Sequence, residues 1–198
     1  SLLLAVELKL TTHFFIYAQK AFAGNASLNM EELQWFIPRK KFSEVDFLDS
    51  LIANQGKNIS NYAPVNRQYY LLQKFLEDYY RINKEESWGD TIPIPQKGYR
   101  LGDSLPEIAL IKHKLRLLGD FYEPDSSHIF TDSLKVAVMR FQYRHGLTED
   151  GVAGKQFIQQ LNEPPVNRIR QILINMERLR WVPEEPETDF LLVNIPEY

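Results

Sequence analysis

Apolar residues recur every three or four positions along most of this chain, and this spacing restricts it to a largely helical fold. The first such segment covers residues 4–23 and is followed by Gly24, a typical helix stop. Its predicted buried face consists of Val6, Leu10, Phe14, Tyr17 and Ala21. We therefore expect an amphipathic helix that packs against the rest of the chain.

Two more helices are predicted before the first break in the pattern. Ser43 and Asp46 form a capping-box-like start for a short helix that ends at Gly56. Pro64 fits the first turn of a longer helix that runs to about Ile82. The first part of the chain is therefore predicted to be an all-helical bundle.

Prolines and glycines interrupt the periodic pattern between Ser87 and Pro106, and we place a domain boundary there. Three shorter helices are predicted beyond it: one closed by Gly119, one capped by Thr131 and stopped at Gly146, and one over residues 157–161. Together they predict a compact three-helix unit of about 60 residues, near the lower limit for independent folding.

The last segment combines a helix with a short β-type run. The helix is expected from about Val166 to Trp181, and the β-type run covers residues 190–196 without a partner strand in view. We therefore predict an all-α chain in three parts. Residues 1–97 form a helical support, residues 98–163 form the three-helix unit, and residues 164–198 lead into the first strand of a further domain.

Composition excludes several classes of function. The net charge of −3 argues against a nucleic-acid partner, and no apolar run reaches the roughly 18 residues of a membrane span. The chain has no cysteine, which removes disulfides, thiolate metal sites and cysteine nucleophiles. Its four histidines lack the spacing of a metal site, so we expect no metal, no cofactor and no catalytic residue.

Residues 141–154 have the pattern F-Q-x-x-x-G-L-x-x-D-G-x-x-G, which resembles the peptidoglycan-binding domain found beside many cell-wall hydrolases and transpeptidases. The side chain of Phe141 is expected to anchor the core, and the turn residues are expected to adopt left-handed or tight-turn conformations. The structural members of the motif are Phe141, Gly146, Leu147, Gly151 and Gly154. Phe157 stands where that family usually has threonine, which weakens any expectation for the cap of the third helix.

A wider resemblance covers nearly the whole chain. The run from Arg168 to Pro183 is similar to the segment that joins the binding module to the catalytic domain in large murein L,D-transpeptidases, and residues 192–196 are similar to the first catalytic strand. That family uses a cysteine nucleophile, which this chain lacks. The resemblance implies a non-enzymatic region of a periplasmic or cell-envelope protein. It would bind peptidoglycan and orient it for cross-linking by a catalytic domain in cis that is missing here.

Ligand-contacting residues are expected near the helix junctions of the three-helix unit. Residues 108–180 contain 11 basic and 8 acidic side chains, a balance that suits the free carboxylates of a stem peptide, while exposed aromatic rings suit sugars. The candidates are Arg116, Tyr122, Gln142, Tyr143, Arg144 and Asp150. A purely structural alternative is that Arg144 and Asp150 pair with each other or cap helices.

Two functional alternatives stay open at this point. The three-helix unit could dock a partner protein of the cell envelope in place of a glycan or peptide, which would make the chain an interaction platform. The chain could also be an enzyme in its own right, with an active site that its sequence motifs do not reveal.

Overall fold

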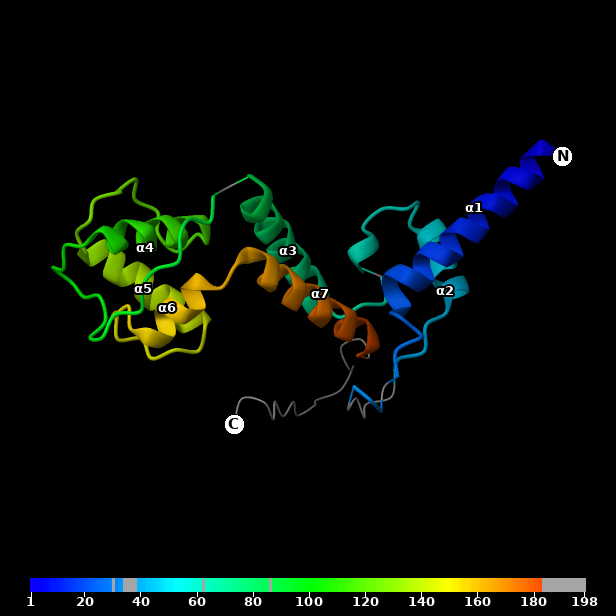
Figure 1. Ribbon diagram of the computed structural model, residues 1–198. Coiled ribbons are helices and arrows are strands. Elements are labelled where there is room, and N and C mark those ends of the chain that lie inside the picture. Colours follow the sequence, from blue (N-terminus) through cyan, green and yellow to red (C-terminus); the bar gives the residue numbers. More distant parts are fainter. Residues whose placement is uncertain (30, 34–38, 62, 86, 183–198) are drawn as a thin grey trace. The chain divides into compact units, whose positions relative to one another are not determined.

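The computed structural model describes residues 1–29, 31–33, 39–61, 63–85 and 87–182 (Figure 1). The described residues form an all-α fold, as predicted, in which the only β-type pairings are isolated bridges between Tyr99 and Ala153 and between Ser104 and Ile129. The predicted strand at 190–196 lies outside the described residues. The helices are α1 (Leu2–Ala18), η1 (Gln19–Ala23), α2 (Glu44–Ala53), η2 (Ile59–Asn61), α3 (Arg67–Glu85), α4 (Pro106–Leu117), α5 (Asp132–Arg144), α6 (Lys155–Asn162) and α7 (Pro165–Trp181).

The chain divides into two compact units. The first contains Ser1–Leu76 and Gln171–Tyr198, and the second contains Glu77–Arg170. The division therefore falls inside α3 and inside α7. The three-part division inferred from the sequence stays a prediction.

The core of the first unit is aromatic. Phe22 and Phe47 are buried and meet edge to face, with ring centroids 4.9 Å apart. Ala18, Ala63 and Val65 complete the buried cluster. Such aromatic contacts add to the stability gained from apolar burial alone.

The burial predicted for the first helix is wrong over most of its length. Val6, Leu10 and Tyr17 are 47%, 66% and 61% exposed, and Ala18 is the buried residue of α1. Periodicity predicted the helix and its stop correctly, since Gly24 has φ +76°, but the last turns are a π-helix. The packing lies only at the C-terminal end, where Phe14 stacks on Phe47 at 5.6 Å.

Helix starts in the first unit follow side-chain caps. The Ser43 side chain accepts a hydrogen bond from the Asp46 N–H at 3.2 Å, which confirms the predicted cap of α2. The prediction that Pro64 lies in the first turn of α3 is wrong, because α3 begins at Arg67. Asn66 precedes it and accepts from the Gln68 N–H at 2.9 Å, so an asparagine cap and not the proline marks this start.

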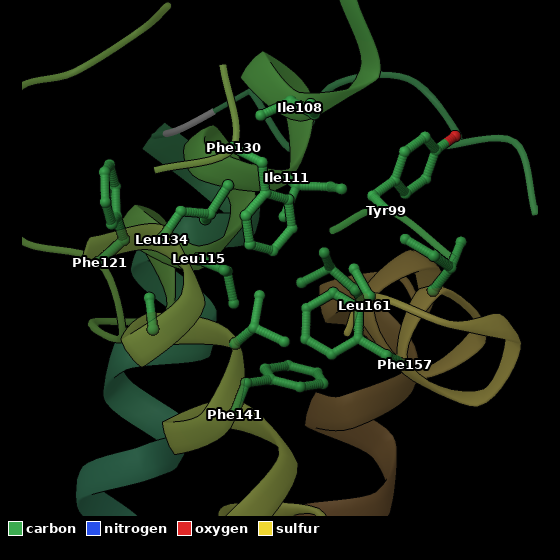
Figure 2. Packing of buried hydrophobic residues seen from close by; sticks show 14 of the residues in the cluster. Tyr99, Ile108, Ile111, Leu115, Phe121, Phe130, Leu134, Phe141, Phe157 and Leu161 are labelled. Carbon is green, nitrogen blue, oxygen red and sulfur yellow. The ribbon is translucent and has the colours of Figure 1, made fainter. Parts of the chain in front are cut away.

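The second unit has a continuous apolar core contributed by α4, α5, α6 and the segments around them (Figure 2). Phe141 from α5 and Phe157 from α6 are almost fully buried and meet edge to face, with ring centroids 4.9 Å apart. Ile92 and Tyr99, which precede α4 in the chain, belong to the same core. The Phe157 ring therefore fills the space between α5 and α6.

Local signals fixed the ends of these helices. Thr131 caps α5 by accepting from the Leu134 N–H at 3.4 Å, and Gly119 and Gly146 follow α4 and α5 with φ +77° and +63°. These three positions confirm the predicted start and stops. α6 begins at Lys155, and its N-cap residue Gly154 provides no side-chain cap.

Across the described ranges, no helix combines the length and the apolar character needed to cross a membrane.

Candidate functional site

The loop after α5, which carries the second half of the 141–154 motif, is held by one buried glutamine. Gln142 is 3% exposed, and its amide nitrogen donates to Asp150 Oδ1 at 2.7 Å and to the Val152 carbonyl at 3.1 Å. Its amide oxygen accepts from the Gly151 N–H at 3.0 Å. The side chain therefore satisfies three polar groups of the loop and acts on the protein surface only through the loop it supports.

Asp150 stabilises the same loop by accepting hydrogen bonds within it. Its Oδ1 also accepts from the Val152 N–H at 2.9 Å, two residues on, which is the geometry of an Asx turn. Gly151 then needs a left-handed conformation, with φ +69°, and a Cβ there would lie 2.8 Å from Lys135 Cγ. The Asp150-Gly151 pair therefore forms the predicted tight turn.

The remaining motif residues build the end of α5. Leu147, which directly follows Gly146, packs against the core and donates its N–H to the Gln142 carbonyl at 2.9 Å. His145 stacks on the Phe141 ring with centroids 3.8 Å apart, and its burial lowers the pKa of the imidazole. Phe141 is thus covered on one face by the imidazole ring and lies fully inside the core.

Arg144 pairs with a different partner from the one considered in the sequence. Its guanidinium makes two hydrogen bonds to Asp120, one from Nε to Oδ1 at 3.1 Å and one from a terminal nitrogen to Oδ2. Asp120 is 4% exposed and directly follows Gly119. The suggested pairing of Arg144 with Asp150 is therefore wrong, because Asp150 faces Gln142 and a buried carboxylate 24 residues earlier takes the arginine.

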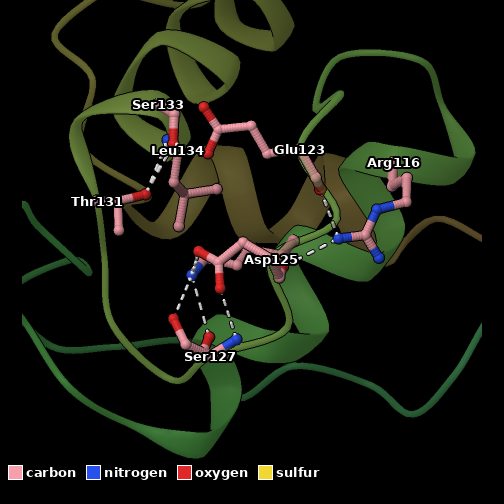
Figure 3. A network of polar contacts seen from close by, with 8 residues as sticks. Arg116, Glu123, Asp125, Ser127, Thr131, Ser133 and Leu134 are labelled. Atoms are coloured by element: carbon pink, nitrogen blue, oxygen red, sulfur yellow. Dashed lines mark hydrogen bonds and ion pairs between the residues drawn. The ribbon is translucent and has the colours of Figure 1, made fainter.

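Arg116 holds the loop between α4 and α5 (Figure 3). One guanidinium nitrogen donates to the main-chain carbonyls of Glu123 and Asp125, both at 2.9 Å. The guanidinium carbon also lies 5.6 Å from the centroid of the Phe121 ring. Arg116 thus holds residues 121–125 in place through two main-chain carbonyls and one aromatic ring.

A fully buried lysine pins the next part of this loop. The Lys112 ammonium donates to Asp125 Oδ2 at 2.5 Å, to the Ser127 carbonyl at 3.1 Å and to the Ser127 hydroxyl at 3.0 Å. The three bonds use all three protons of the ammonium group, which is what a buried charge requires. The hydrogen bond from Lys112, assisted by Ser127, lowers the pKa of Asp125 to about 2.

The two candidate tyrosines lie on the surface. Tyr122 is 75% exposed and Tyr143 is 72% exposed, although each follows a buried residue, Phe121 and Gln142 respectively. Arg140, which the sequence did not single out, places its guanidinium carbon 5.2 Å from the centroid of the Tyr122 ring. This distance is within the range of a cation–π interaction.

Two family models match the chain. Residues 1–76 match the model described as "Scaffold domain", and residues 104–161 match the one described as "Putative peptidoglycan binding domain". The chain therefore contains a scaffold domain and a peptidoglycan-binding domain. No curated protein matches the chain.

Two polar residues that were not among the site candidates also stabilise the second unit. Asn162 at the end of α6 accepts from the Ile92 N–H at 2.9 Å and donates to the Ile92 carbonyl at 2.8 Å. Lys114 is 1% exposed, bonds Asn162 at 3.3 Å and lies 4.9 Å from the Trp88 ring centroid, and burial lowers its pKa. Lys112 lies at helical spacing among the buried residues Ile108, Ile111 and Leu115 of α4. Lysine is unusual in such an apolar stripe, and this local signal could have identified Lys112 from the sequence.

Among the described residues, no three histidine, aspartate or glutamate side chains gather as a metal site would require.

Proposed function

We propose that this chain binds peptidoglycan through its three-helix domain, and that the helical support places the bound wall material for cross-linking by an L,D-transpeptidase domain. The observation that carries the proposal is the pair of family matches, to a scaffold domain at 1–76 and to a peptidoglycan-binding domain at 104–161, in one chain. The contribution to the reaction is proximity and orientation.

The geometry of the domain supports this proposal. Arg144, Arg116 and Gln142 support its loops, while Tyr122 and Tyr143 are presented to solvent. A rigid framework that presents a few exposed side chains is what a binding module needs, because little ordering entropy is lost on association. This role places the protein in the periplasm or elsewhere in the cell envelope.

A pull-down on purified sacculi tests the proposal. We expect the chain to be retained above a control protein of similar size and charge, and we expect a variant with a disrupted motif turn, Gly151→Val, to lose retention because the loop cannot close. Circular dichroism of the variant separates a local effect from global unfolding.

Failure of the chain to be retained at any salt concentration would contradict peptidoglycan binding. That result would favour the interaction platform, in which the same surface docks a protein of the cell envelope.

A further inference from the structure

We infer that the peptidoglycan-binding domain recognises the glycan strand of the wall, through an aromatic surface formed by Tyr122, Arg140 and Tyr143. We call this surface the tyrosine platform. The inference deepens the proposed function and rests on it: it selects the sugar backbone of peptidoglycan over the stem peptide as the ligand of this site.

Tyr122 is exposed, but the loop that carries it is fixed in place. The preceding residue, Phe121, is 2% exposed and anchors the loop in the core. The following residue, Glu123, is held at its main-chain carbonyl by Arg116 at 2.9 Å and at its carboxylate by the Ser133 hydroxyl at 2.7 Å (Figure 3). An aromatic ring presented by a loop pinned on both sides loses little entropy when a ligand binds.

One face of the Tyr122 ring is covered by Arg140. Arg140 lies 5.2 Å from the ring centroid, and its guanidinium also donates to the Asp120 carbonyl at 3.4 Å. A cation above one face of a ring leaves the other face for a ligand, and the side chain remains 75% exposed. Arg140 is therefore a positioning residue for this ring.

The spacing of residues along α5 places Tyr143 beside Arg140. Arg140 and Tyr143 are three residues apart, so their side chains are neighbours on one face of the helix. That face points away from the core, which Val138 and Phe141 enter with no exposed surface. The 72% exposed Tyr143 ring thus extends the surface that begins at Arg140.

The state of the cationic side chains favours a sugar over a peptide. Carboxylates of a stem peptide require free cationic groups, but three cations of this region are engaged within the domain. Arg144 binds Asp120, Arg116 binds two main-chain carbonyls, and Lys112 is buried against Asp125 and Ser127. The exposed side chains of the platform are Tyr122, Tyr143 and Arg140, and the Arg140 guanidinium lies over the Tyr122 ring and donates to the Asp120 carbonyl. The tyrosine faces suit the apolar faces of N-acetylated sugars while the hydroxyl groups stay hydrated.

The test measures binding of the full chain to three probes: intact sacculi, glycan strands freed of peptide, and a soluble stem tetrapeptide. We expect binding to sacculi and to peptide-free glycan, and no binding to the tetrapeptide. Tyr122→Ala and Tyr143→Ala are each expected to weaken glycan binding about three- to tenfold, the range that corresponds to one aromatic contact. Tyr122→Phe is expected to bind like the wild type.

Matched controls distinguish a platform from general destabilisation. Tyr80→Ala removes a tyrosine that is 50% exposed on α3 and belongs to the same unit, so it is expected to leave glycan binding unchanged. Arg140→Ala is expected to weaken binding, and Arg140→Lys, which keeps a cation near the ring, is expected to recover part of the loss.

Two results overturn the inference while leaving the proposed function in place: retention on sacculi without binding to peptide-free glycan, or equal weakening by Tyr80→Ala and Tyr122→Ala. Absence of retention on sacculi contradicts the proposed function itself, and the inference fails with it.

Discussion

At the scale of single residues, the two left-handed glycines of the motif differ in their surroundings. A Cβ at Gly146 meets no atom within 4 Å, whereas one at Gly151 lies 2.8 Å from Lys135 Cγ. Gly146→Ala is therefore expected to lower the free energy of unfolding by about 1–2 kcal/mol, the strain of a left-handed alanine. Gly151→Ala also forces Lys135 to move, so we expect it to lower the free energy of unfolding by about 2–4 kcal/mol. Urea unfolding measures both values. Equal costs would show that Lys135 makes room freely.

A second prediction at this scale concerns acid stability. The pKa of Asp125 is about 2 in the folded protein, against an ordinary value of 3.8. A depressed pKa contributes stability that is present above the ordinary value and is lost as the pH falls toward 2. Asp125→Asn is thus expected to flatten the pH dependence of the unfolding free energy between about pH 4 and pH 2. An unchanged slope in the variant would remove Asp125 as its source.

Side-chain contacts could be predicted only where the two partners are close in sequence. The Asp150-Gly151 turn was predictable because both bonds of Asp150 lie within eight residues. The pairing of Arg144 with Asp120 was not, because it joins positions 24 apart that meet only after α4 and α5 pack. Burial of Lys112 depends in the same way on a loop that folds back over α4.

Among the helices, changes at two N-cap positions are expected to affect stability in opposite directions. Thr131→Ala removes the side-chain acceptor of the Leu134 N–H and is expected to destabilise the domain by about 1 kcal/mol. Gly154 starts α6 without such an acceptor, has ordinary backbone angles and leaves open space for a Cβ.

Gly154→Asp is accordingly expected to stabilise the domain by a few tenths of a kcal/mol, although Gly154 is a motif residue. Thermal unfolding of both variants measures the two effects. A loss of stability in Gly154→Asp would mean that the motif requires glycine there for a reason other than local conformation.

Helix positions were more predictable than helix burial. Periodicity and turn residues correctly gave α4, α5 and α6, whose starts and stops depend on neighbouring residues. The same periodicity wrongly predicted a buried face along α1, because it identifies an apolar stripe without saying what packs against it. The start of α3 was predicted wrongly for a different reason: the local signal was present in the sequence as Asn66, which caps the helix, but Pro64 two residues earlier also fits a first turn.

At the scale of the whole molecule, the sequence predicted the class of fold and the presence of a binding module from a resemblance spread over many short segments. It did not indicate which candidates face solvent. Of the six candidate ligand residues, Gln142 is turned inward, and Arg116, Arg144 and Asp150 bind groups of the domain itself. The two tyrosines are therefore the most accessible candidates. Exposure is a property of the folded domain, so a motif cannot reveal it.

Recognition of peptidoglycan by the 104–161 domain can be measured by nuclear magnetic resonance titration of the isotopically labelled full chain with solubilised peptidoglycan fragments. We expect saturable shifts of backbone amides around Tyr122, Arg140 and Tyr143, with resonances of residues 1–76 unchanged. Shifts confined to residues 1–76, or no saturable shift anywhere at millimolar fragment, would contradict it.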